Sequence, residues 1–281
     1  MRIIGWPTYK PSRTPSLNKK AIMIPKIIHL CWLSGDAYPP LIQACIDSWK
    51  QQLPDYEIRL WDTHRFDINS TLWTRQAFEV RKYAFAADYI RLYALYHEGG
   101  IYLDSDVMVY RSFDDLLDLP YFIGEDFIHL FEPAIIGCEP GNPWIGKVLE
   151  RYHDRPFVKA DGTYDLQALP LVFRQQLVPD YSFRRITSKE AFREDPGVMN
   201  IFSSEFFNGR DYIGAIRFPN GYCSHCFLGS WLKAESATKG KLRRLLPRAL
   251  VNLLYRYRYQ YSDLHMKQIP YQDPKDLTLR C

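Results

Sequence analysis

The spacing of apolar residues changes twice in the first ordered part of the chain. Branched and aromatic residues dominate 24–32 ("IPKIIHLCW"), which predicts a strand that Pro25 can open. Apolar residues then recur every three or four positions over 39–54, the pattern of a helix closed by Pro54. Apolar and polar residues alternate over 56–62, which predicts a second strand. The order strand, helix, strand indicates an α/β fold.

A longer helix and another strand are expected next. Residues 81–98 are mostly good helix formers, and Gly99 and Gly100 predict where this helix ends. The following residues, 101–110 ("IYLDSDVMVY"), predict a single strand. After it we expect a further strand, a loop and a helix that begins near Pro143.

The two ends of the chain differ from its middle. Residues 1–24 are rich in Pro, Ser and Lys and predict a flexible extension. Residues 160–215 have no clear period, whereas 221–232 predict a last strand and turn. We therefore expect one folded domain over 25–235 and a separate tail over 236–281.

The tail has its own pattern of charge. Between Lys233 and Arg258 there are eight basic residues and one acid, Glu235, and leucines recur at helical spacing. In one interpretation the leucines pack on the domain and the cations face water. In another, this basic amphipathic helix lies on an anionic membrane surface. Contact with nucleic acid is not expected, because the net charge of the whole chain is only +4.

Composition places the chain among ordinary globular proteins. Its 281 residues are 47% hydrophobic and 24% charged, and none of its apolar runs reaches the roughly 18 residues that a membrane span needs. The first residues lack the apolar core of a signal peptide. The six cysteines are spread widely and predict free thiols. Together these features predict a cytoplasmic protein that attaches to the membrane at most peripherally.

Two acids end the apolar run at the centre of the chain. In an extended strand, Asp104 and Asp106 would point to the same face and repel each other. A hard divalent cation such as Mg²⁺ or Mn²⁺ would relieve that repulsion and would also bind phosphate oxygens. The alternative is that each Asp only caps a turn.

The preceding helix carries a second charged pair. Asp88 and Arg91 are three positions apart, so they lie on one helix face among core residues. They could form a buried ion pair that holds the helix in place. They could instead bind a ligand, with Asp88 accepting from sugar hydroxyls and Arg91 holding a carboxylate or phosphate.

Five segments together resemble the family 32 glycosyltransferases, which contain a DXD sugar-binding region. These segments are "IPKIIHLCW", "SWKQQLPDYEIRLWD", "KYAFAADYIRLYALYHEGGIYLDSDVMVYRSFDDLL", "AIIGCEPGNPWI" and "HCFLGSWL". The family includes capsular polysaccharide enzymes, α-1,6-mannosyltransferases and α-1,4-galactosyltransferases. The chain is more distantly similar to the glucosylating domains of large bacterial toxins.

The resemblance implies a GT-A type fold, a single domain with a Rossmann-like nucleotide-binding sheet. It also implies metal-dependent, retaining transfer of a hexose from a nucleotide-sugar, with a UDP-sugar favoured and GDP-mannose as the second candidate. The acceptor would be a glycan or a lipid-linked oligosaccharide in the synthesis of a surface polysaccharide, such as capsule or lipopolysaccharide.

The resemblance also assigns roles to residues at the metal. Asp106 corresponds to the direct metal ligand, and Asp104 would reach the ribose and the metal. His225 corresponds to a further ligand, and an imidazole ligand favours Mn²⁺ over Mg²⁺.

Other positions correspond to donor-binding residues of the family. Asp88 and Arg91 would hold the donor sugar, and Tyr102 is also expected to bind the donor. Trp32 would flank the nucleotide base. Ser230 and Trp231 would contact the diphosphate.

Catalysis needs one more carboxylate in this interpretation. Glu125 and Asp126, in the segment "GEDF", are the two candidates. Either could act as a nucleophile in a double displacement, or position the acceptor hydroxyl while it attacks from the leaving-group face. We favour acceptor positioning.

Two hypotheses from other classes compete with a transferase. A phosphohydrolase of the haloacid dehalogenase type would use Asp104 as its nucleophile, but it gives no role to Asp88 or Arg91. A non-catalytic sugar-binding homologue would keep the donor site without turnover.

Overall fold

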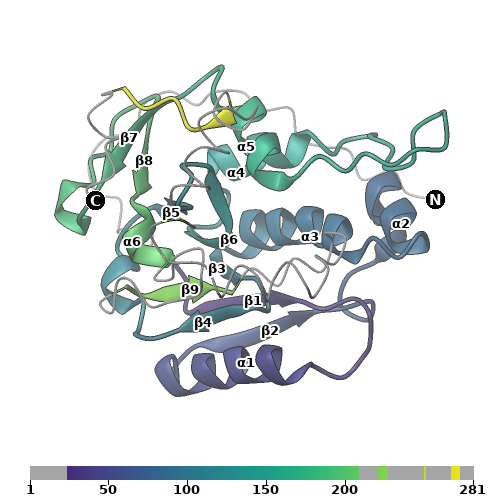
Figure 1. Ribbon diagram of the computed structural model, residues 1–281, viewed down its shortest axis with the longest axis horizontal. Coiled ribbons are helices and arrows are strands. Elements are labelled where there is room, and N and C mark those ends of the chain that lie inside the picture. Colours follow the sequence, from purple (N-terminus) through teal and green to yellow (C-terminus); the bar gives the residue numbers. More distant parts are fainter. Residues whose placement is uncertain (1–23, 209–220, 227–249, 251–266, 273–281) are drawn as a thin grey trace.

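The computed structural model describes residues 24–208, 221–226, 250 and 267–272. A mixed sheet of seven strands forms its centre, in the order β2-β1-β3-β6-β5-β8-β7 (Figure 1). Only β6 of these seven runs against the others, so the predicted α/β class is confirmed. The strands are β1 (Ile27–Cys31), β2 (Glu57–Trp61), β3 (Gly100–Leu103), β5 (Tyr121–Glu125), β6 (Phe131–Cys138), β7 (Ser182–Ile186) and β8 (Val198–Phe202).

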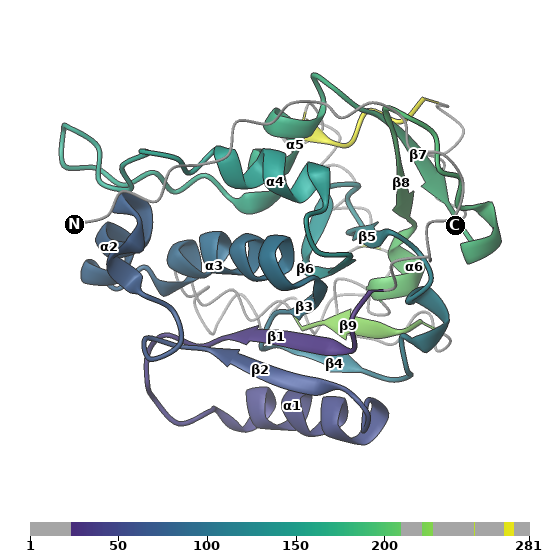
Figure 2. The same cartoon turned by 180° about the vertical axis from the view of Figure 1, so that it is seen from behind.

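Helices cover both faces of this sheet. Figures 1 and 2 show α1 on one side of it and α3, α4 and α5 on the other. The side chains of β3 alternate between the two faces of the sheet. Ile101 and Leu103 pack into the core beside α1, whereas Tyr102 packs into the core beside α3. The helices are α1 (Pro40–Gln52), α2 (Leu72–Glu79), α3 (Tyr83–Glu98), α4 (Pro143–Glu150), α5 (Leu169–Leu177) and α6 (Ser204–Phe207).

Most of the predicted elements in the first half are confirmed. The strands β1 and β2 and the helices α1 and α3 lie where the apolar periods place them, and α4 begins at Pro143. The apolar pattern of the sequence does not predict α2, α5, β7 or β8. The last three lie in 160–215, where Pro and Phe residues interrupt both periods.

The strand predicted over 101–110 is wrong. It is two strands, β3 and β4 (Val107–Val109), in different sheets. A turn separates them, with the amide of Val107 donating to the carbonyl of Asp104 at 3.0 Å. Asp104 and Asp106 therefore approach each other because the chain turns, not because a strand alternates.

One more short strand lies beside β4. The predicted last strand is confirmed as β9 (Cys223–His225), which pairs antiparallel with β4. Val107 lies opposite His225, and the amide of Cys226 donates to the carbonyl of Asp106 at 2.9 Å. This pairing fixes His225 beside the turn that holds both aspartates.

The two glycines after α3 have positive φ values and close neighbours. Gly99 and Gly100 have φ values of +64° and +94°. A Cβ on Gly100 would lie 2.8 Å from the carbonyl oxygen of Ile27 in β1. The carbonyl of Gly99 is bound by Nε2 of His29 at 2.7 Å. The chain can pass directly from α3 into β3 only because both residues lack a side chain.

Several sequence predictions lie outside the described residues. They include the extension over 1–23 and the amphipathic helix of the tail. The domain boundaries at 25, 235 and 236 thus stay predictions, as does peripheral membrane attachment through the tail. Among the residues that the structure describes, no helix is long and apolar enough to cross a membrane.

We predict that Gly100→Ala destabilises the protein more than Gly162→Ala. Both glycines have positive φ, but space is open around Gly162, so only Gly100→Ala adds a backbone clash. Strain alone costs about 1–3 kcal/mol at such a position, and the clash at Gly100 adds to it. Urea denaturation of the two variants would measure the difference in free energy of unfolding. Equal losses would contradict close packing of β3 against β1.

Candidate active site

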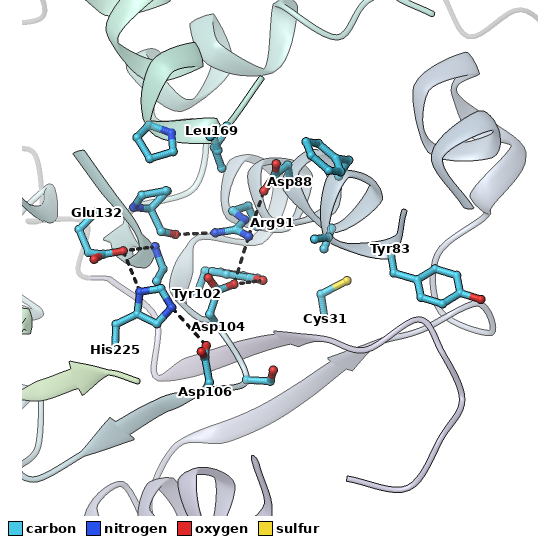
Figure 3. Close-up of a pocket in the computed structure, with 18 of the residues that line it drawn as sticks. Cys31, Tyr83, Asp88, Arg91, Tyr102, Asp104, Asp106, Glu132, Leu169 and His225 are labelled. Atoms are coloured by element: carbon cyan, nitrogen blue, oxygen red, sulfur yellow. Dashed lines mark hydrogen bonds and ion pairs between the residues drawn. The ribbon is translucent and has the colours of Figure 1, made fainter. Parts of the chain in front are cut away.

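A cavity of about 640 Å³ lies where β1 and β3 end, within the usual size range of ligand sites. Figure 3 shows that charged side chains from several elements converge at it. Among the described residues, its lining includes five carboxylates and two basic residues, Arg91 and His225. The carboxylates are those of Asp88, Asp104, Asp106, Asp126 and Glu132. This excess of negative charge calls for a cationic ligand.

Arg91 is the fixed positive charge of the site. Its guanidinium lies 3.0 Å from Oδ1 of Asp88 and 3.1 Å from Oδ1 of Asp104. It also donates to the carbonyl of Pro133 at 2.8 Å, and it lies 4.5 Å from the ring centre of Tyr102. Asp88 and Arg91 thus form the expected buried ion pair, and both also line the cavity.

Burial and charge have opposite effects on the Asp88 carboxyl. Burial raises the pKa of Asp88, Arg91 lowers it and Asp104 raises it further, and together they place it at about 7. Near neutral pH this group is therefore divided between its two protonation states. A sugar hydroxyl that donates to Asp88 would favour the carboxylate.

The predicted metal ligands lie together. One ligand atom from each of Asp104, Asp106 and His225 lies within 4.8 Å of the other two. Nε2 of His225 is 3.3 Å from Oδ1 of Asp106. Two carboxylates and an imidazole are a donor set that suits Mn²⁺, so the side chains fit the predicted cation.

Glu132 is a member of the site that the sequence analysis missed. Its Oε1 lies 3.3 Å from Nδ1 of His225, on the opposite side of the ring from Asp106 (Figure 3). The side-chain amide of Asn208 donates to Oε2 of Glu132 at 2.8 Å. Such a carboxylate behind a histidine fixes the orientation of the ring. The only signal in the sequence is an acid just before Pro133, at the start of a buried strand.

These neighbours also control the charge of His225. Burial lowers the pKa of His225, but Glu132 and Asp106 outweigh burial and hold it well above its usual value. In the absence of a metal, the imidazolium is therefore the favoured form. A metal ion needs the neutral ring, so the proton must leave when the ion binds.

Two aromatic residues of the donor prediction also line the cavity. Trp32 follows β1, and its Nε1 donates to the carbonyl of Asp36 at 2.8 Å. Tyr102 lies in β3, and its hydroxyl donates to Oδ1 of Asp104 at 2.9 Å. Tyr102 thus holds Asp104 and Arg91 in place. Ser230 and Trp231 lie outside the described residues.

The structure separates the two catalytic candidates after β5. Asp126 lines the cavity, and its Oδ1 accepts from the amides of Ile128 and Leu130, both at 2.9 Å. Glu125 is completely buried, does not belong to the cavity lining, and pairs with Arg185. Of the two, only Asp126 can reach a ligand in the cavity.

A comparison with protein families bears directly on this site. Residues 39–123 match the model described as a glycosyltransferase sugar-binding region containing the DXD motif. The match includes Asp88, Arg91 and both aspartates of the turn. Residues 39–123 are thus similar to the sugar-binding region of DXD glycosyltransferases.

Curated relatives extend beyond the DXD region. Mannosyl phosphorylinositol ceramide synthase SUR1 of Saccharomyces cerevisiae is 29% identical over 69% of this chain and 52% of its own length. Inositol phosphoceramide mannosyltransferase 3 of Schizosaccharomyces pombe is 30% identical over 47% of this chain and 38% of its own length. The chain thus spans about half or less of the length of these relatives.

A solved structure is similar to part of this chain. The PaToxG glycosyltransferase is 21% identical, with a TM-score of 0.37, and the alignment covers 46% of this chain and 60% of that chain.

We predict that Glu132→Gln weakens Mn²⁺ binding by about tenfold to a hundredfold, because the imidazole loses the carboxylate behind it. Isothermal titration calorimetry would measure the dissociation constant. Glu57→Gln is the control, since Glu57 is exposed and pairs with Arg59 away from the cavity. Equal affinities for the two variants would remove Glu132 from the metal site.

The raised pKa of His225 predicts that metal binding depends on pH. Below that pKa, one proton must leave for each ion bound, so affinity should rise by up to about tenfold for each unit of pH. His225→Gln should bind the ion more weakly and should release about one proton fewer. Calorimetry in two buffers with different ionisation enthalpies measures this proton release. The same proton release in both proteins would show that His225 does not bind the metal.

Proposed function

We propose that the protein is a metal-dependent, retaining glycosyltransferase that moves a hexose from a nucleotide-sugar to a glycan or a lipid-linked acceptor. The observation that carries this proposal is the meeting of the DXD turn, His225 and the Asp88–Arg91 pair at one cavity. In this function Asp104, Asp106 and His225 would hold the cation. When bound, a divalent cation supplies positive charge that stabilises a leaving diphosphate.

The chain's own residues would bind and orient the donor. Asp88 accepts hydrogen bonds from sugar hydroxyls, and its neighbour Arg91 places a fixed positive charge close to the leaving group. Arg91 cannot turn away, because two carboxylates and a carbonyl hold it. Trp32, at the end of β1, offers its ring to the nucleotide base.

Asp126 would position the acceptor. Its Oδ1 is occupied by two backbone amides, which leaves Oδ2 for a hydroxyl in the cavity. Burial, and next the nearby Glu132, raise the pKa of Asp126 well above its usual value, so the group can share a proton with that hydroxyl. Because Glu125 lies outside the cavity, Asp126 is the one of the two candidates that could act on a ligand there. We assign it to the acceptor hydroxyl, which would then attack from the leaving-group face.

The remaining wall of the cavity is largely apolar. Leu169, the first residue of α5, lies on the side of the cavity away from His225 and Asp106 (Figure 3), and Phe85 and residues 168–171 belong to the lining. Such a wall suits an acceptor with an apolar part. The names of the yeast relatives contain a mannosyl group and a ceramide, which supports mannose as the first donor sugar to test and a glycolipid as the first acceptor.

We predict that GDP-mannose or a UDP-hexose is slowly hydrolysed in the presence of Mn²⁺ without any acceptor, since water can take its place. Release of nucleoside diphosphate measures this activity across a panel of donors. EDTA or Asp106→Asn should lower the rate by a factor on the order of a hundred or more. Asp118→Asn should not, because Asp118 is an exposed partner of Lys189. Donor binding without release by any donor would instead support a non-catalytic sugar-binding protein.

Asp126→Asn tests the acceptor side separately. An amide cannot take a proton from the attacking hydroxyl or water, so turnover should fall by about a hundredfold or more. The affinity for Mn²⁺ should not change, since Asp126 is not a metal ligand in this proposal. Unchanged turnover would refute the role of Asp126 but not that of the DXD turn.

A further inference from the structure

A segment from the C-terminal part of the chain packs against one wall of the cavity. Residues 267–272 lie beside β7, where Tyr271 forms a parallel bridge with Phe183 (Figure 1). We name Asp126–Leu130 the wall loop, because its two ends, Asp126 and Leu130, line the cavity. Residues 267–272 belong to the tail that was expected to be separate from the domain, and the structure brings them into contact with the wall loop.

Three hydrogen bonds join this segment to the wall loop or to the residue before it. The amide of Ile269 donates to the carbonyl of His129 at 2.9 Å. The side-chain amide of Gln268 donates to the carbonyl of Ile128 at 2.8 Å. The hydroxyl of Tyr271 donates to Oε2 of Glu125 at 2.8 Å. The segment therefore contacts the backbone of the wall loop and also Glu125, the residue just before the loop.

Glu125 connects these parts. Its carboxylate is completely buried and binds Arg185 of β7, Nδ1 of His129 and the hydroxyl of Tyr271. A buried carboxylate that loses one of its partners is destabilised, because water cannot replace the missing donor. The sheet, the wall loop and residues 267–272 thus share one buried charge.

The wall loop links the interactions of Glu125 to the cavity. His129 has a φ of +62°, a conformation that needs support from its surroundings. The same loop folds the amides of Ile128 and Leu130 onto Oδ1 of Asp126. Any change in the backbone at 128–130 would therefore turn the Asp126 carboxylate.

We propose that residues 267–272 are a working part of the active site, in which Tyr271 is a positioning residue that fixes the wall loop and thereby aims Asp126 at the acceptor. The inference about turnover rests on the proposed function, whereas the inference about the loop does not.

Tyr271→Phe tests the inference, and Tyr56→Phe is its matched control. Both hydroxyls donate to a carboxylate at 2.8 Å, and both residues are about equally buried, but Tyr56 binds Asp114 away from the cavity. Hydrogen–deuterium exchange of peptides that cover 126–130 and 104–109 measures local opening in the full chain. In Tyr271→Phe, amides 128–130 should exchange about tenfold faster, while the peptide with the DXD turn should not change.

A double-mutant cycle on donor hydrolysis provides the second measurement. Tyr271→Phe should lower turnover in the wild-type background, should have little effect in the Asp126→Asn background, and should leave Mn²⁺ affinity unchanged. Unchanged exchange at 128–130, or faster exchange throughout the chain, would overturn the inference. Equal effects of Tyr271→Phe in both backgrounds would also overturn it.

The two measurements separate this inference from the proposed function. If no donor is hydrolysed but exchange rises only at 128–130, the proposed function fails and the control of the wall loop by Tyr271 is supported. If donors are hydrolysed but exchange at 128–130 stays the same, the proposed function stands and the inference fails.

Discussion

Mutual repulsion among four neighbouring acids, Asp88, Asp104, Asp106 and Glu132, is the constraint on which this site depends. They line one cavity whose described lining offers only Arg91 and His225 as opposing charges. The protein holds each of these cations between two acids, Arg91 between Asp88 and Asp104, and His225 between Asp106 and Glu132. These two bridges allow the acids to remain close together, and they leave the cavity poised for a ligand that carries positive charge.

The backbone around the cavity serves this arrangement. The glycine pair after α3 lets a helix that carries Asp88 and Arg91 continue at once into the strand that leads to Asp104. Tyr102 then faces the layer of α3 because β3 alternates, and it supports both Arg91 and Asp104. The positions of the polar and apolar walls of the cavity thus follow from which face of a central strand a side chain occupies and from where that strand ends.

Local patterns in the sequence predicted the parts of this site that depend on neighbouring residues. The periods of β1, α1, β2 and α3 were clear, and the spacing of Asp88 and Arg91 placed them on one helix face. The single strand over 101–110 was wrong, because the pairing of Val107 with a distant strand interrupts it. Glu132 and the difference between Glu125 and Asp126 could not be predicted either, since they depend on Asn208, Arg185 and Tyr271, which are remote in sequence.

The pairing of β4 with β9 has a consequence for the order of events during synthesis. Loop closure between distant segments is slow and costs chain entropy, so such contacts form after local ones. Helix α3 and the acids at its end can be present early on a growing chain, but His225 joins them only after β9 has left the ribosome. A nascent chain therefore passes through a stage in which its acidic cluster lacks its histidine. In the proposed function, metal ions met at that stage would find an incomplete ligand set, and full metal affinity would require a chain that has been made at least to β9.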